Sequence, residues 1–173
     1  EFTDDTIKRV LELCENENVE GLSILGGEPM NPKNIDGTTK LAKAFKDNTK
    51  AVLGETISNP SLDVLDIEKF AKLAHDHKVP LIVDNTFATP ILCRPLKFGA
   101  DIIIHSTSKY MDGHAAALGG VIVDGGKFDW AASGKFPSFT TPDESYHGVV
   151  YAKDFGNQAF ITKARAQLMR DLG

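Results

Sequence analysis

Two uninterrupted apolar runs, Leu81-Ile82-Val83 and Ile102-Ile103-Ile104, constrain the fold of this chain more than any other feature of its sequence. A strand that is apolar at every position has both faces covered, which is typical of parallel sheets with helices on either side. Segments with helical spacing of apolar residues alternate with the expected strands. We therefore predict an α/β fold, mainly a parallel sheet flanked by helices.

The elements alternate along most of the chain. We expect strands at residues 19–25, 51–57, 79–83, 101–105 and 120–123. Helices are expected where apolar residues recur at intervals of three or four. The first helix is expected at 4–17, capped by Thr3 or Asp4, and a second around 41–45. A third follows the cap Asp66 and is expected to bury Ile67, Phe70, Leu73 and Ala74. The last begins at about Phe155, ends at Gly173 and carries on one side Phe160, Ile161, Ala164, Leu168 and Met169.

Residues 124–151 interrupt this alternation. They are rich in Gly, Ser, Thr and Pro, with scattered aromatic residues, and they keep no period for long. Such a composition is typical of loops. We expect an extended surface excursion between the last strand and the last helix.

Charge and cysteine content exclude several classes of function. The chain has 24 acidic and 19 basic residues, a net charge of -5, so no broad basic face is expected for nucleic acid or anionic lipid. No apolar run is long enough to cross a bilayer, and the first residues lack the pattern of a signal peptide. We expect a cytoplasmic protein in which Cys14 and Cys93 are reduced, mostly buried thiols.

Polar clusters follow three of the expected strands. They are Ser58-Asn59-Pro60, Asp84-Asn85-Thr86 and the run from His105 to Tyr110. The carboxyl ends of parallel strands are where ligands enter such sheets. Each cluster also has an ordinary interpretation, since a carboxylate at a strand end often caps a helix, a serine-rich run is often a loop, and a single lysine is often only solvated.

The chemistry of these residues suits one kind of ligand. Asp84 follows buried aliphatic residues, so its carboxylate needs a cationic partner, and a protonated pyridine nitrogen is such a partner. Ser106 and Ser108 stand at alternate positions and are expected to point together at a phosphate. The amine of Lys109 next to them is placed to form a Schiff base with a carbonyl.

Residues 48–173 resemble the central part of the Cys/Met-metabolism family of fold-type I pyridoxal-phosphate (PLP) enzymes, in its O-acetylhomoserine sulfhydrylase branch. The resemblance rests on the stretches that run from Glu55 to Pro60, from Val83 to Phe87 and from His105 to Tyr110, followed by Gly113-His114 and Gly119-Gly120. The segment between Asp124 and Gly148 resembles an insertion of the sulfhydrylase branch, absent from the shorter lyases. The resemblance thus covers most of the chain.

The resemblance implies a role for each site residue. Lys109 would bind PLP covalently and act in catalysis, together with Asp84 at the pyridine nitrogen, while Asn59 would contact the ring oxygen. Ser106 and Ser108 would hold the phosphate. The implied reaction is γ-replacement on O-acetylhomoserine by sulfide or methanethiol, which gives homocysteine or methionine, in a homo-oligomer whose partners are small molecules. No metal is implied.

The first part of the chain resembles a different family. Residues 2–45, above all Gly26-Gly27-Glu28-Pro29, resemble part of a radical S-adenosylmethionine activating protein of anaerobic ribonucleotide reductase. We therefore predict two units, 1–47 of this second origin and 48–173, a partial PLP-binding domain, joined near residues 40–50.

Three functions follow as alternatives. The chain is derived from a PLP enzyme, or it is a folded but catalytically silent chimera, or, least favoured, it is a radical-enzyme activator. The family's upstream phosphate loop, its ring-stacking aromatic residue and its carboxylate-binding arginine have no counterpart in these 173 residues. Arg165 and Arg170 stand in no motif that assigns them that last task. We therefore expect the chain by itself not to turn over O-acetylhomoserine.

Overall fold

A computed structural model describes residues 22–23 and 42–172 of the chain. The predicted helix at 4–17, the ends of the predicted strand at 19–25, Cys14 and the Gly173 cap lie outside these residues. Within them, Leu22–Ser23 forms strand β1, in the middle of the predicted strand. Of the helix predicted around 41–45, Ala42 is the one helical residue among 42–45, and the chain turns at Lys43 and Ala44.

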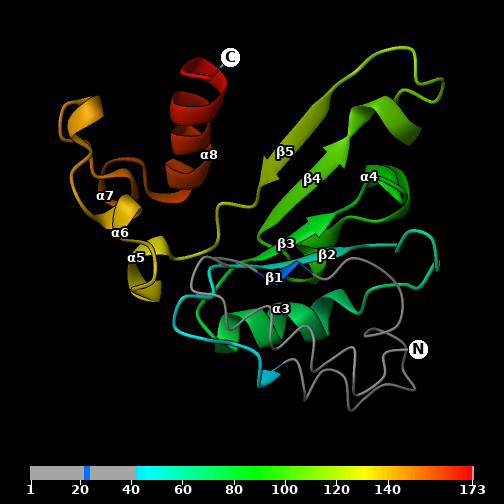
Figure 1. The fold of residues 1–173 in the computed structure, drawn as a ribbon, viewed down its shortest axis with the longest axis horizontal. Coiled ribbons are helices and arrows are strands. Elements are labelled where there is room, and N and C mark those ends of the chain that lie inside the picture. The colour runs from blue at the N-terminus through cyan, green and yellow to red at the C-terminus, as the bar shows by residue number, and fades with distance from the viewer. Residues whose placement is uncertain (1–21, 24–41, 173) are drawn as a thin grey trace.

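The core of the fold is a five-stranded sheet in the order β1-β2-β3-β4-β5 (Figure 1). The first four strands pair in parallel and β5 pairs antiparallel to β4, with Ser106 opposite Gly120. The prediction of a mainly parallel sheet flanked by helices is therefore confirmed. The strands after β1 are β2 (Val52–Glu55), β3 (Leu81–Asp84), β4 (Ile102–Ser106) and β5 (Gly120–Asp124).

Helix α3 (Ile67–Asp76) covers one face of the sheet (Figure 1). As predicted, Asp66 caps it, since its side chain accepts a hydrogen bond from the Lys69 amide at 3.1 Å. The inner face of α3 packs on the side chains of β2 and β3 that point towards it, while Leu73 is only half-buried. This aliphatic core consists of Val52, Leu65, Ile67, Phe70, Ala71, Ala74, Val79, Leu81, Val83 and Ala100.

A second core covers the opposite face, where the sequence predicts only a surface excursion. Residues 124–151 instead form α5 (Trp130–Ser133), α6 (Pro137–Thr140) and η5 (Glu144–Tyr146), and they bury Trp130 and Phe139. The ring of Trp130 stacks on Phe139, with centroids 4.4 Å apart, and the cluster packs on Ile82 and Ile102. The prediction was wrong here because a few large rings bury much surface without any periodic pattern.

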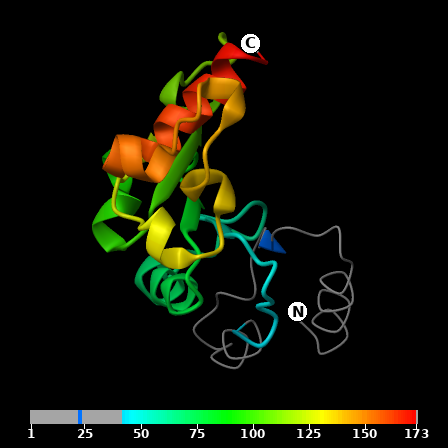
Figure 2. The ribbon, with the colours of Figure 1, turned by 90° about the vertical axis from the view of Figure 1, so that its left-hand side faces the viewer.

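The chain ends in a broken helical segment rather than the single helix that was predicted. Its parts are α7 (Tyr151–Phe155), η6 (Gly156–Gln158), α8 (Ala159–Ala164) and η7 (Arg165–Arg170). From α5 onwards these elements lie in front of the sheet in Figure 2. Ala159 is buried as the helix packs, but Leu168 and Met169 are exposed, contrary to the predicted apolar side.

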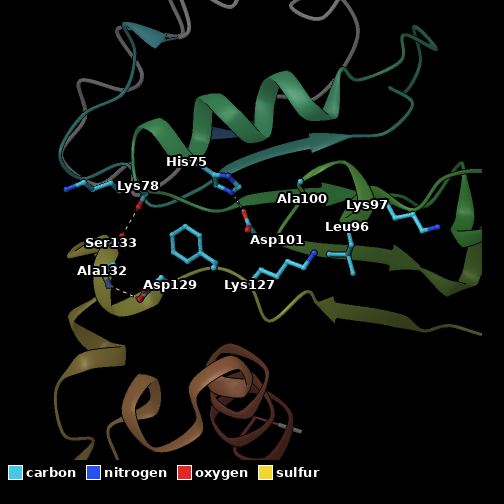
Figure 3. Close-up of a pocket in the computed structure, with 12 residues that line it drawn as sticks. His75, Lys78, Leu96, Lys97, Ala100, Asp101, Lys127, Asp129, Ala132 and Ser133 are labelled. Atoms are coloured by element: carbon cyan, nitrogen blue, oxygen red, sulfur yellow. Dashed lines mark hydrogen bonds and ion pairs between the residues drawn. The ribbon is translucent and has the colours of Figure 1, made fainter.

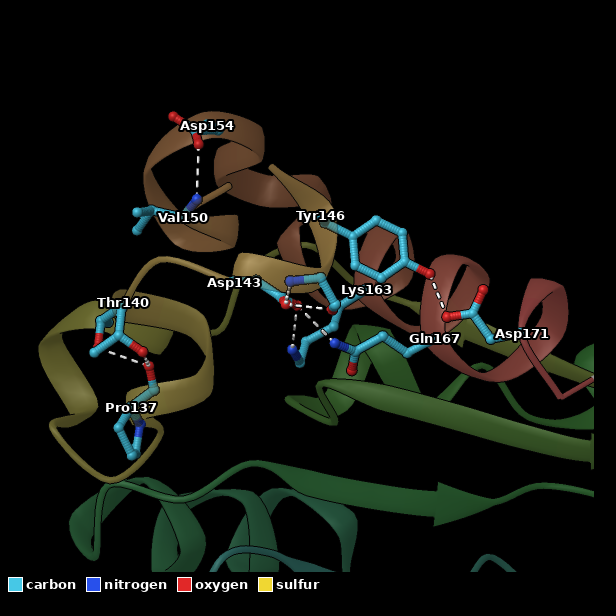
Figure 4. A network of polar contacts seen from close by, with 11 residues as sticks. Pro137, Thr140, Asp143, Tyr146, Val150, Asp154, Lys163, Gln167 and Asp171 are labelled. Atoms are coloured by element: carbon cyan, nitrogen blue, oxygen red, sulfur yellow. Dashed lines mark hydrogen bonds and ion pairs between the residues drawn. The ribbon is translucent and has the colours of Figure 1, made fainter. Parts of the chain in front are cut away.

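Polar contacts attach this C-terminal segment to the loop before it (Figure 4). Gln167 donates to a carboxylate oxygen of Asp143 at 2.7 Å, and the Tyr146 hydroxyl donates to Asp171. The bond to Asp171 raises the pKa of Tyr146 to about 12, and the hydroxyl of Ser145 holds the pKa of Asp143 below its usual value. These contacts fix the last helical turns without a large apolar face.

Three short segments complete the description and lead towards the site. They are α4 (Thr89–Leu92), η3 (Pro95–Phe98) and η4 (Thr107–Met111). Across the ranges that the structure describes, no helix has the length and apolar character needed to cross a membrane.

Candidate functional site

The carboxyl ends of β2, β3 and β4 surround a small cavity. Because these strands are parallel, the segments that follow them gather at one edge of the sheet, on the right of Figure 1. The cavity has a volume of about 180 Å³. It is lined by Glu55, Ile57, Asn59, Asp84, Thr86, Phe87, Ser106 and Lys109, so the structure brings together four of the five predicted site residues.

Ser108, the fifth predicted residue, lies elsewhere. Strand β4 ends at Ser106 and the chain turns into η4, so the alternation expected of a strand does not extend to Ser108. Its hydroxyl accepts a hydrogen bond from the Gly119 amide at 2.8 Å. Ser108 lines a neighbouring cavity of about 330 Å³ that shares Phe87 and Lys109 with the first. Its contact with a phosphate stays a prediction.

Thr86 links the Asp84 carboxylate to the end of β4. The Thr86 amide donates to Oδ1 of Asp84 at 2.9 Å, and the Thr86 hydroxyl oxygen accepts from the Ser106 amide at 2.8 Å. Asp84 is half-buried, and no cation lies within ion-pair distance of its carboxylate among the described residues. The carboxylate is therefore held in place with an oxygen open to a cationic ligand.

Asn85 joins the segments at the ends of the three strands. Its side chain is fully buried, accepts from the Thr56 hydroxyl at 2.7 Å and donates to the Cys93 carbonyl at 2.9 Å. Its main-chain oxygen accepts from Nδ1 of the buried His105 at 3.1 Å. Cys93 is a half-buried free thiol whose pKa is raised by burial. These bonds fix the spacing between the segments that carry Asn59, Asp84 and Ser106.

Lys109 stands at a break in η4. Its backbone is non-helical, with φ -96° and ψ -123°, and its carbonyl accepts from the Gly113 amide at 2.9 Å. The side chain is exposed, and its amine makes no ion pair within the part of the chain that the structure describes. Lys109 lines both cavities, and its amine is free to bond to a ligand.

Sequence reasoning gave no site role to four residues that line the cavity, Glu55, Ile57, Thr86 and Phe87. Glu55 lies in register with Asp84 on the neighbouring strand, and its Oε2 accepts from the Asn59 amide at 2.9 Å. Thr86 and Phe87 follow Asp84 directly, and the Phe87 ring meets Tyr110 edge-on at 5.6 Å. Glu55 falls inside the strand predicted at 51–57, and its place at the cavity follows from its pairing with Asp84.

A larger cavity lies at the opposite end of the strands (Figure 3). It has a volume of about 590 Å³ and is bordered by α3, η3 and the loop before α5. His75 points at the buried carboxylate of Asp101, with Nε2 and Oδ2 2.8 Å apart, and Asp101 also accepts from the Leu81 amide. Lys78 and Lys97 extend away from the cavity on opposite sides. Polar side chains at its rim are bonded to the protein itself: Asp129 accepts from the amides of Ala131 and Ala132, and Ser133 donates to the Lys78 carbonyl.

The cavity lies at the carboxyl edge of a mainly parallel sheet and is surrounded by an amine, two carboxylates, an amide and hydroxyls. This arrangement is typical of an α/β protein that binds a small polar ligand. The chain belongs to the Cys/Met metabolism PLP-dependent enzyme family, whose model matches residues 27–156. PLP is the cofactor of that family.

Individual relatives agree with this assignment. An O-acetyl-L-homoserine sulfhydrylase of Corynebacterium glutamicum is 49% identical over 156 residues, 88% of this chain and 36% of the relative. A homocysteine/cysteine synthase of Saccharomyces cerevisiae is 48% identical over 140 residues, 80% of this chain and 32% of the relative. The chain thus spans about a third of the length of these curated relatives.

A solved structure from Campylobacter jejuni, described as an O-acetylhomoserine (thiol)-lyase with N'-pyridoxyl-lysine-5'-monophosphate, has the same fold. Its TM-score is 0.72 and its identity 38%, over 80% of this chain and 35% of that one. The described part of the present chain is therefore about a third of such a fold.

The residues of the small cavity fit PLP by their chemistry. The cofactor presents an aldehyde, a ring nitrogen, a ring oxygen and a phosphate, and the cavity offers an amine, a carboxylate, an amide and a hydroxyl, from Lys109, Asp84, Asn59 and Ser106 in that order. Phe87 adds an apolar surface for the ring.

Proposed function

We propose that this chain is the cofactor-binding part of an enzyme that replaces the γ-substituent of O-acetylhomoserine with sulfide or methanethiol, giving homocysteine or methionine. The observation that carries the proposal is the convergence of Lys109, Asp84, Asn59 and Ser106 on one cavity. Relatives that are 48% to 50% identical bear names that describe this reaction.

Each residue has a task in such a reaction. The Lys109 amine would hold the cofactor through its aldehyde and would move the proton of the substrate Cα. Asp84 would keep the pyridine nitrogen protonated, Asn59 would orient the ring through its oxygen, and Ser106 would hold the phosphate, with Ser108 as a second donor. Bound PLP supplies an electron sink for the charge that develops at Cα.

The same proposal covers partners and location. The substrates are small molecules, O-acetylhomoserine and sulfide or a thiol, and the complete enzyme is a homo-oligomer in the cytoplasm. Neither nucleic acid nor membrane is a partner. Radical chemistry is not part of the proposal, because the family match supports only the PLP chemistry.

We further propose that the 173 residues alone are catalytically silent, with the division between 1–47 and 48–173 retained as a prediction. γ-Replacement needs the substrate carboxylate fixed so that its Cα–H bond is aligned with the ring, and such orientation accounts for several kcal/mol of a barrier. A chain that spans about a third of its relatives supplies only part of these contacts.

Two measurements test the proposal. In an enzyme as long as the relatives, Asp84→Ala should reduce turnover far more than it reduces PLP affinity. If the variant keeps most of its turnover, Asp84 does not have the proposed role. For the 173-residue chain, a sulfide-dependent homocysteine assay with Lys109→Ala as the blank should show no activity above the blank. Robust activity that the blank lacks would contradict the predicted silence.

A further inference from the structure

Glu55 is a charged residue of the small cavity to which the proposed function gives no task. It ends β2, it is half-buried, and it lines the cavity together with Asp84. The two residues are in register on neighbouring parallel strands, which lie about 4.8 Å apart. The cavity therefore has two carboxylates side by side on its wall.

Neither carboxylate is neutralised by the protein around it. No lysine, arginine or histidine lies within ion-pair distance of Glu55 or Asp84 among residues 22–23 and 42–172. Two adjacent carboxylates favour a positive charge that enters the cavity between them and Lys109. The arrangement suits a ligand whose cationic form is the one to be bound.

Glu55 also determines where Asn59 lies. Its Oε2 accepts the hydrogen bond of the Asn59 amide at 2.9 Å, across the turn that follows β2. Asn59 is exposed, and this is the hydrogen bond that holds its amide. The Glu55 side chain therefore both fixes the position of Asn59 and supplies a negative charge at the cavity.

We propose that Glu55 is a positioning residue of the cofactor site, which anchors Asn59 and supplies a second negative charge that favours the protonated form of the lysine-bound cofactor. This inference rests on the proposed function. Glu55 acts through Asn59 and through its charge next to Asp84. The two contributions are separable by substitution.

Glu55→Gln keeps an oxygen that accepts from the Asn59 amide but removes the charge, whereas Glu55→Ala removes both. A third variant, Glu144→Gln, removes an equal charge from an exposed residue of η5 and serves as the control. The test is to titrate each 173-residue protein with PLP, measure the affinity, and then follow the visible absorbance of the lysine-bound cofactor against pH. Circular dichroism verifies that each variant is folded.

The midpoint of the pH titration should fall by about one pH unit in Glu55→Gln, because a lost negative charge lowers the pKa of a neighbouring cationic group. PLP affinity should change little in that variant. Glu55→Ala should show the same lowered midpoint and about tenfold weaker PLP binding, close to the loss of one charge-assisted hydrogen bond. Glu144→Gln should match the wild type in both measurements.

Each result has one meaning. An unchanged midpoint in Glu55→Gln would overturn the role of the charge, and unchanged affinity in Glu55→Ala would overturn the anchoring of Asn59. If the wild-type chain itself forms no lysine-bound PLP, the cofactor site and this inference both fail. That outcome is distinct from the others, because it concerns the protein without any substitution.

Discussion

The two ends of the sheet contain cavities of opposite character. The cavity at the amino ends is about three times larger, yet its carboxylates are already engaged, Asp101 by His75 and the Leu81 amide and Asp129 by the first amides of α5. The cavity at the carboxyl ends is small, but the Asp84 carboxylate and the Lys109 amine remain open to a ligand. The comparison teaches that unsatisfied polar groups on rigid strand ends indicate a site better than volume does.

The largest expected contrast between the two ends concerns their lysines. Reduction with borohydride in the presence of PLP should attach the cofactor to Lys109, and Lys109→Ala should lose this label because no other lysine among the described residues lines the small cavity. Lys127→Ala, in the larger cavity, should keep the label. Peptide mapping by mass spectrometry measures both. If the label is instead spread evenly over several surface lysines, Lys109 is not a specific site for PLP.

The aspartates of the two ends should differ in the free energy of unfolding. Asp101→Ala should cost about 2 kcal/mol, because it leaves the buried Leu81 amide without its partner. Asp84→Ala should cost less than about 1 kcal/mol, since it removes one local bond to Thr86 from a half-buried group. Urea denaturation of the three proteins measures the difference. Equal costs would mean that Asp84 is as structural as Asp101.

The smallest expected contrast compares two hydroxyls. Thr86→Val leaves the Ser106 amide without an acceptor, and Ser133→Ala frees the Lys78 carbonyl, so each should cost about 1 kcal/mol of stability. Only Thr86→Val should also weaken PLP binding, by a few-fold, because it releases Ser106 at the cavity. Equilibrium dialysis with PLP gives the affinities. A matching loss in Ser133→Ala would show that binding follows general stability.

The sequence predicted those helices and strands whose characteristic pattern lies within a few consecutive residues. The run Leu81-Ile82-Val83 and the Asp66 cap are such elements, and both stand where they were expected. The antiparallel direction of β5 could not be predicted in this way, because direction depends on how the chain returns from Met111 to Gly120. The aromatic core around Trp130 was missed since its contacts join residues far apart in sequence.

The same limit applies to the site. Asn59, Asp84, Ser106 and Lys109 were named from the clusters in which they stand, and the parallel strands then brought them to one cavity. Glu55 acquires its position only from its register with the neighbouring strand, which no single segment encodes.

Strand β5 has a practical consequence for all of these measurements. It is the outer strand of the described sheet on that side, and Val121, Ile122 and Val123 are each exposed by 37% or more. An apolar strand with free backbone groups along one edge is a template for pairing with an identical strand. Concentrated samples of the 173-residue chain should therefore aggregate through this edge, and dilute, freshly prepared protein should give the cleanest titrations.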